Sequence, residues 1–201
     1  MTERIADPAD RRSPEAAAIA DLGFIRATME RATTFTAVPG RGAMAMGLVA
    51  LATSVRTWSE PVSPLWLQLW LFTALIASLI GLFAMQRKAH TSGGTLRSAA
   101  GTRFALAFGP ALVAGMVLTV VLWRTPGAAA LVPGVWLLCY GVAVMAAGTH
   151  SVRLVPLMGL GFLLLGAVAL VQPTIAPWAL ALGFGGLHLV GGYSIARHHG
   201  G

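Results

Sequence analysis

The chain has 201 residues, of which 56% are hydrophobic and only 10% are charged, whereas a soluble domain carries about 25% charged residues. No residue after Glu60 is acidic; such a composition excludes a soluble globular protein and favours one that lies in a lipid bilayer. The net charge of +7 comes from short segments between long apolar runs, which argues against the basic face of a nucleic-acid-binding domain.

The first 38 residues are too polar to lie within a membrane. Residues 1–12 are predicted to form a disordered tail. Residues 13–38 are predicted to form an amphipathic helix, because Ser13 is a good N-cap and Pro14 suits the first helical position. Apolar side chains recur along one side of this helix, at Ile19, Leu22, Ile25 and Met29. We expect the helix to lie on the inner membrane surface or against the inner loops, and the alternative is a solvated helix without a partner.

Six segments then approach the length of about 20 mostly apolar residues that a helix needs to cross a bilayer. They cover approximately 40–56, 65–85, 104–123, 131–149, 154–171 and 177–196. The first is short and rich in glycine, and the third contains Pro110, which can kink a membrane helix. The predicted fold class is therefore all-α. It is a polytopic membrane bundle of six transmembrane helices in residues 39–197, with a C-terminal tail of residues 198–201.

Two distributions predict the orientation of this bundle. If the N-terminus is cytoplasmic, all of the 14 Lys and Arg residues except Arg56 and Arg124 lie on or beside cytoplasmic segments, as expected for an inner-membrane protein. Tryptophans prefer the membrane interface, and those of this chain fall at or near the opposite, outer ends of the predicted helices. They are Trp58, Trp66, Trp70, Trp123, Trp136 and Trp178. Both distributions predict that the two termini face the cytoplasm.

Glycines recur at seven-residue intervals on the last three predicted helices. They are Gly134, Gly141 and Gly148 on the fourth, Gly159 and Gly166 on the fifth, and Gly185 and Gly192 on the sixth. Because seven residues make nearly two helical turns, each set lies on one face, and faces of small residues let membrane helices pack closely. We interpret them as packing surfaces that could also bind a protein partner or a second copy of the chain. The alternative is that they leave room for a lipid or ligand.

His188 is the ionisable residue nearest the middle of a predicted membrane helix, and such residues indicate a site by default. Tyr140 is predicted at a similar depth on the fourth helix, which runs in the same direction as the sixth. A hydrogen bond between Tyr140 and His188 is therefore expected, and no cofactor is predicted. The alternative is that His188 binds haem, as a single axial ligand or as a pair across a dimer.

Signatures of catalysis are missing from the sequence. It contains no HExxH, Gly-x-Ser-x-Gly or P-loop motif, and the last five predicted helices contain no carboxylate for acid–base chemistry within the membrane. We therefore predict that the protein is not an enzyme and has neither catalytic residues nor a metal site. The lipid bilayer is its expected surrounding, and nucleic acid is not an expected partner.

Two motifs resemble those of a known group of proteins. Ile25-Arg26-x-x-Met29-Glu30-Arg31, followed by Phe35-Thr36-Ala37-Val38-Pro39-Gly40, resembles the opening of an uncharacterised family of bacterial six-helix integral membrane proteins. Gly183-Phe184-Gly185-Gly186-Leu187-His188 resembles the last helix of that family. The resemblance implies a bacterial inner (plasma) membrane but no activity. The favoured function is a non-enzymatic scaffold, accessory or regulatory membrane subunit. The alternatives are a small transporter or channel, and a haem- or quinone-binding membrane protein centred on His188.

Overall fold

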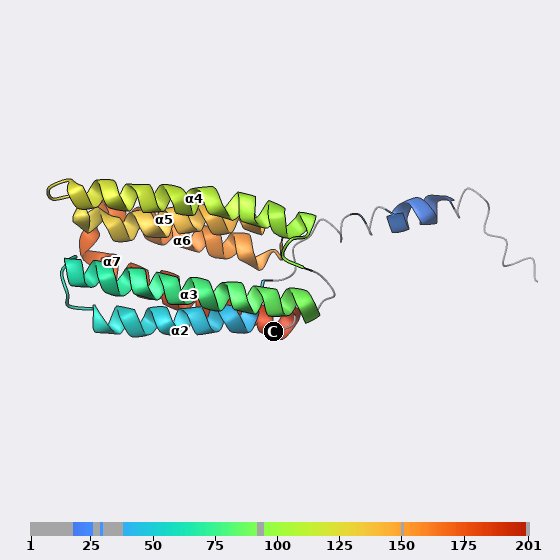
Figure 1. Cartoon of the computed structure of the whole chain (residues 1–201), viewed down its shortest axis with the longest axis horizontal. Helices are drawn as coiled ribbons and strands as arrows, with labels where there is room; N and C mark the ends of the chain where they lie inside the picture. Colours follow the sequence, from blue (N-terminus) through green and yellow to red (C-terminus); the bar gives the residue numbers. More distant parts are fainter. Residues whose placement is uncertain (1–17, 26–28, 30–37, 92–94, 150, 200–201) are drawn as a thin grey trace, which may run out of the picture. The chain divides into compact units, whose positions relative to one another are not determined.

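The computed structural model describes residues 18–25, 29, 38–91, 95–149 and 151–199. Its internal contacts divide the chain into two units, Met1–Thr34 and Phe35–Gly201. In the first unit, residues 18–25 are helical and exposed (Figure 1). This helix covers part of the predicted amphipathic helix. The predicted tail of residues 1–12 and the predicted helix start at Ser13 and Pro14 lie outside the described residues.

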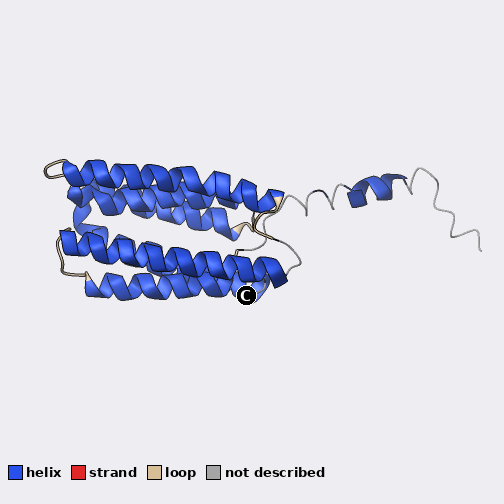
Figure 2. Cartoon of the chain, in the orientation of Figure 1, coloured by secondary structure: helices blue, strands red, loops and turns tan. Residues whose placement is uncertain are grey.

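The described part of the second unit consists of helices and short connections, without strands (Figure 2). Its α-helices are α2 (Gly40–Arg56), α3 (Pro64–Thr91), α4 (Ala99–Arg124), α5 (Val132–Gly148), α6 (Leu154–Val171), α7 (Ala176–Leu180) and α8 (His188–His199). The π-helix η4 (Ala181–Leu187) joins α7 to α8, and short 3-10 turns precede α5 (η2, Ala129–Leu131) and α7 (η3, Pro173–Ile175). The predicted all-α fold class is confirmed.

Five helical spans are long and apolar enough to cross a membrane. They are Pro64–Thr91, Ala99–Arg124, Ala129–Gly148, Leu154–Val171 and Pro173–His198, and they match the second to sixth predicted segments. The chain is therefore a multi-pass membrane protein by the length and composition of its helices. The first predicted segment matches α2, whose 17 residues stand at the lower limit of about 17–25 residues for a spanning helix. Pro110 lies inside the continuous helix α4.

The last span differs from the regular helix that was predicted over residues 177–196. It begins as the short helix α7, widens into the π-helical turn η4 and returns to α-helical geometry at His188. Gly183, Gly185 and Gly186 all lie in the π-helical part. Glycine is a poor helix former, so this part of the sequence stabilises regular α-helical geometry less than the rest of the span does. Helix α8 then continues through His199, into the predicted C-terminal tail.

The helices of the second unit lie side by side along its length (Figure 1). Helix α3 packs on α2, α2 on α8 and η4, η4 on α6, α6 on α5, and α5 on α4. The helices form two groups of three, α2/α3/α8 and α4/α5/α6. The groups meet where α7 and η4, the first part of the span that ends in α8, contact α5 and α6. The largest buried cluster contains side chains from both groups, among them Trp70 of α3, Leu137 of α5 and Phe162 of α6. The large apolar side chains of α3 and α4 are mostly exposed, as lipid-facing side chains are, and the two helices meet where Ala89 and Ala100 share a small buried cluster.

The glycines of α5 and α6 lie in the contact between these two helices. A Cβ atom built on Gly159 would lie 2.7 Å from the backbone nitrogen of Met145 and 2.9 Å from the carbonyl oxygen of Gly141. A Cβ atom on Gly166 would lie 2.8 Å from the backbone nitrogen of Leu138. Gly134 and Gly148 face α6 at similarly short distances. Side chains at these positions would force the two backbones apart.

The glycines of the last span make an equivalent contact with α2. A Cβ atom on Gly192 would lie 2.7 Å from the carbonyl oxygen of Gly40, and one on Gly185 would overlap the side chain of Leu51. A Cβ atom on Gly47 of α2 would in turn lie 2.8 Å from the carbonyl oxygen of Gly185. Each group of three helices therefore contains one pair of helices held at short distance by glycines on both sides.

Candidate functional site

His188 occupies the first position of α8 and is 5% exposed. Its Nε2 atom lies 2.8 Å from the hydroxyl oxygen of Tyr140 on α5, and its Nδ1 atom lies 3.0 Å from the carbonyl oxygen of Phe184. A carbonyl can only accept, so in the neutral ring Nδ1 carries the proton and Nε2 accepts the proton of Tyr140. The predicted contact between His188 and Tyr140 is confirmed by this distance. That the pair forms a functional site stays a prediction.

Aromatic rings surround this pair on three sides. The His188 ring centroid lies 5.4 Å from that of Phe162 and 6.4 Å from that of Phe184, and the Tyr140 ring makes edge contacts with both phenylalanines. Phe108 of α4 also contacts Tyr140, with 5.8 Å between the ring centroids. In such an apolar surrounding an unpaired polar atom is costly, so the bond between His188 and Tyr140 holds the last span and α5 together.

Both ring nitrogens of His188 are therefore engaged by protein atoms. A haem iron bound at Nε2 would have to displace the hydroxyl of Tyr140, and one bound at Nδ1 would have to displace the carbonyl of Phe184. Among the described residues, no three His, Cys, Asp or Glu side chains gather as a metal site. The geometry thus favours a structural hydrogen-bonded pair over an exposed metal ligand.

A chain of aromatic contacts leads from this pair to one end of the bundle. Phe184 contacts Trp70 with 6.2 Å between ring centroids, Trp70 contacts Trp66 at 6.0 Å, and Trp66 stacks on Trp136 at 5.5 Å. Trp66 and Trp70 are 4% and 3% exposed. Both belong to the first turns of α3, so their predicted depth near the outer membrane face stays a prediction, while their side chains fill the space between the two helix groups.

Two of the three indole N–H groups in this row of rings are bonded to protein side chains. Trp70 Nε1 donates to Thr57 Oγ1 at 3.1 Å, and Trp136 Nε1 donates to Thr119 Oγ1 at 2.7 Å. A tryptophan at a membrane interface keeps its N–H in water, whereas these two need an acceptor from a neighbouring helix. The sequence could not identify the acceptors, because helix neighbours do not follow from one sequence.

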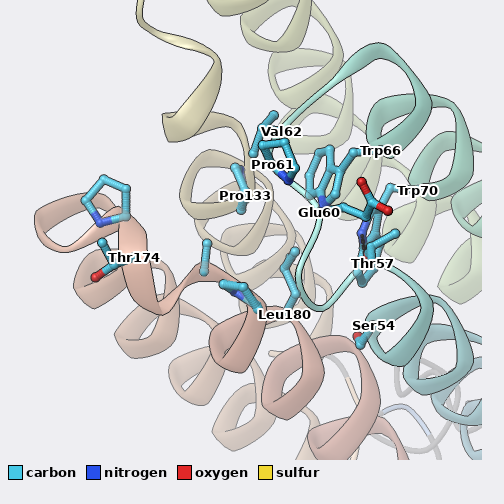
Figure 3. Close-up of a pocket in the computed structure, with 13 residues that line it drawn as sticks. Ser54, Thr57, Glu60, Pro61, Val62, Trp66, Trp70, Pro133, Thr174 and Leu180 are labelled. Carbon is cyan, nitrogen blue, oxygen red and sulfur yellow. Dashed lines mark hydrogen bonds between the residues drawn. The ribbon is translucent and has the colours of Figure 1, made fainter.

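A pocket of about 220 Å³ opens at this end of the bundle, beside the loop between α2 and α3 (Figure 3). Glu60, Thr57, Trp66 and Trp70 gather on one side of it, and Thr174 of η3 lies on the other. The full lining is Ser54, Thr57, Glu60, Pro61, Val62, Trp66, Trp70, Pro133, Pro173, Thr174, Ala176, Pro177 and Leu180. Sequence analysis missed this site. The feature of the sequence that could have indicated it is the isolated carboxylate of Glu60 between tryptophans and prolines.

Comparisons with protein-family models, with curated proteins and with solved structures found no significant match. The resemblance to a family of bacterial six-helix membrane proteins therefore stays a prediction.

Proposed function

We propose that the chain is a non-enzymatic, six-span protein of the bacterial inner membrane that acts as a scaffold, accessory or regulatory subunit. The main support is that polar side chains inside the bundle bond to one another. Besides His188 and the two tryptophans, Thr53 and Thr73 join α2 to α3 with 2.5 Å between their hydroxyl oxygens. Among fully buried side-chain polar atoms of the described residues, Ser151 Oγ is the one without a partner, and it lies in the turn before α6. Interior groups used in this way hold helices together, whereas a transport path needs polar groups free to meet a substrate.

The sixth crossing in this proposal is α2. A helix of 17 residues is about 25 Å long at 1.5 Å per residue, and modest thinning of the bilayer accommodates a short span. Helix α2 packs along α3 on one side and along α8 on the other, and both of these belong to membrane-crossing spans. Arg41 and Arg56 lie near its two ends. With six crossings, the bias of Arg and Lys places both termini in the cytoplasm.

Cysteine labelling tests the sixth crossing. Cys139 is the one cysteine of the sequence, so the labelling uses a Cys139→Ala background. We expect Ser59→Cys to react with a membrane-impermeant maleimide in intact cells and Arg41→Cys to react only after lysis. Residue 41 lies in the first turn of α2 and residue 59 follows its last residue, so they lie on opposite sides only if α2 crosses. Thr125→Cys and Arg97→Cys serve as outer and inner references. Labelling of residues 41 and 59 from the same side would show that the chain crosses five times.

Cross-linking in native membranes tests the accessory role. Residues 1–34 form a unit of their own, and the helix of residues 18–25 exposes Ile19 and Leu22. If this helix is the docking surface, we expect deletion of residues 1–34, or Leu22→Glu in the full chain, to remove the proteins that cross-link to the wild type. Asp21→Lys, a change on the same helix at a residue outside the apolar side, is the matched control. Identical neighbours in the presence and absence of residues 1–34 would contradict docking through the arm.

A second candidate function, a small transporter or ligand-binding protein, is favoured by one observation. The pocket lies where residues of both helix groups meet, since Trp70 belongs to α3, Pro133 to α5 and Leu180 to α7. Transporters commonly bind substrates between two helix groups. Here Trp66 and Trp70 form part of the pocket wall and are buried, so a transport cycle would require these rings to move.

A further inference from the structure

The pocket beside the α2–α3 loop has an unusual balance of charge. Glu60 is the ionisable side chain among its lining residues, and it is the last acidic residue of the chain. Arg56 approaches the Glu60 carboxylate at 3.5 Å, but 60% of the Arg56 side chain is exposed. A pair this long and exposed contributes little, so the carboxylate remains available to a positively charged ligand.

Two of the three hydroxyl groups that line the pocket have committed their protons to backbone carbonyls. Ser54 Oγ donates its proton to the carbonyl oxygen of Ala50 at 2.9 Å, and Thr57 Oγ1 donates to that of Thr53 at 2.8 Å. A hydroxyl has one proton and two lone pairs. With its proton committed to a backbone carbonyl, Ser54 Oγ keeps two lone pairs, and Thr57 Oγ1, which already accepts the indole N–H of Trp70, keeps one.

Donors are scarce in the same lining. Four of its residues are prolines, Pro61, Pro133, Pro173 and Pro177, which have no backbone N–H. The indole N–H of Trp70 is bonded to Thr57. The remaining side-chain donors are the indole of Trp66 and the hydroxyl of the exposed Thr174. A ligand that donates protons or carries positive charge finds more partners here than one that accepts.

Two indole rings complete the site. Trp66 and Trp70 line the pocket and lie 6.0 Å apart, with 39° between their planes. Tryptophan is the aromatic side chain that attracts cations most strongly, within about 6 Å of the ring centroid. The pocket volume of about 220 Å³ is below the range of about 300–1,000 Å³ for drug-sized ligands, so the occupant is small.

We infer that this pocket binds a small organic cation, a protonated or quaternary amine, with the positive charge held by Glu60 and the indole rings. The inference goes beyond the accessory role and does not depend on it. In the proposed six-span topology, the pocket opens toward the outside of the cell.

Binding is tested on the full chain purified in detergent, by titration of its tryptophan fluorescence at constant ionic strength. The cationic probes are choline and propylammonium. Each is compared with a neutral counterpart, the carbon isostere of choline and propanol. We expect a saturable change with at least one cation that its neutral counterpart does not produce, because only the cation meets the carboxylate and the ring faces.

Matched variants locate the binding charge. Glu60→Gln is expected to weaken cation binding about fivefold or more, whereas Arg56→Gln, which frees the carboxylate, is expected to bind as tightly as the wild type or more tightly. Arg124→Gln, at the same end of the bundle but outside the lining, should bind like the wild type. Glu60 lies in an exposed loop, so Glu60→Gln should fold normally. Equal responses to cation and neutral counterpart, or unchanged binding in Glu60→Gln, would overturn the inference.

Discussion

Gly159→Ala is expected to destabilise the protein by about 1–3 kcal/mol, the usual cost of overpacking a core. Alanine stabilises a helix by about 1 kcal/mol relative to glycine, so a position with free space should gain from the same change. At Gly159 the added methyl group meets the backbone nitrogen of Met145 at 2.7 Å and the carbonyl oxygen of Gly141 at 2.9 Å. Backbone atoms cannot rotate away as a flexible side chain can. The clash therefore outweighs the gain in helix propensity, and α5 and α6 must separate.

The loss of stability is measured by heating the protein in detergent and determining by size-exclusion chromatography how much folded protein remains at each temperature. Gly192→Ala should behave like Gly159→Ala, because its added Cβ atom meets the carbonyl oxygen of Gly40 at 2.7 Å. Gly109→Ala and Gly186→Ala are the matched controls. A Cβ atom on Gly109 meets nothing within 4 Å, and one on Gly186 meets only the carbonyl oxygen of Ala181 at 3.9 Å. If all four variants unfold at the same temperature, the glycine faces do not determine how closely the helices pack.

The positions of the membrane helices were largely predictable from the sequence, because hydropathy acts within one segment. The predicted segment 154–171 coincides with α6, and the predicted segment 40–56 coincides with α2. The glycine spacing also correctly marked faces that lie against a neighbouring helix, but it could not say which one. That α5 packs on α6 and α8 on α2 depends on three-dimensional complementarity, which a period of seven residues does not contain.

The π-helix and the burial of the tryptophans could not be predicted, for different physical reasons. A run such as Gly183-Phe184-Gly185-Gly186 weakens a regular helix, but whether it bends, widens or stays regular depends on the neighbours that satisfy its backbone. Tryptophan is suited both to a membrane interface and to an aromatic core. Trp70 is held in the core by its bond to Thr57, and a single sequence does not show that this residue, which follows α2, lies beside α3.

The candidate site shows the same division. The depth of His188 and Tyr140 followed from counting residues along two helices that run in the same direction, and their contact is present at 2.8 Å. The role of Phe184 as a second partner did not follow, because its carbonyl is available within the π-helical turn that was not foreseen. The pocket escaped prediction because its lining combines the α2–α3 loop with residues of α5, η3 and α7.

Tyr140→Phe is expected to cost about 1–3 kcal/mol, because it leaves Nε2 of the buried His188 without a partner. Hydrogen bonds between membrane helices average only about 0.6 kcal/mol, since unfolded segments in the membrane also find partners. The aromatic rings around His188 offer no replacement acceptor or donor near Nε2. We therefore expect this hydrogen bond to contribute more than the average bond between membrane helices. Tyr193, the second of the two tyrosines, is 57% exposed on α8. Tyr193→Phe is therefore the matched control, and it should change stability by less than about 0.5 kcal/mol.

A double-mutant cycle separates the hydrogen bond from the packing of the two side chains. His188→Leu keeps a similar volume and removes both ring nitrogens, so Tyr140→Phe should cost less in the His188→Leu background than in the wild type. We expect a coupling free energy of about 1 kcal/mol. Additive effects would show that the contact does not stabilise the bundle. A Soret band in the purified wild type that disappears in His188→Leu would show instead that His188 binds haem, because a ring nitrogen that binds iron cannot keep its hydrogen bond to Tyr140 or to the carbonyl of Phe184.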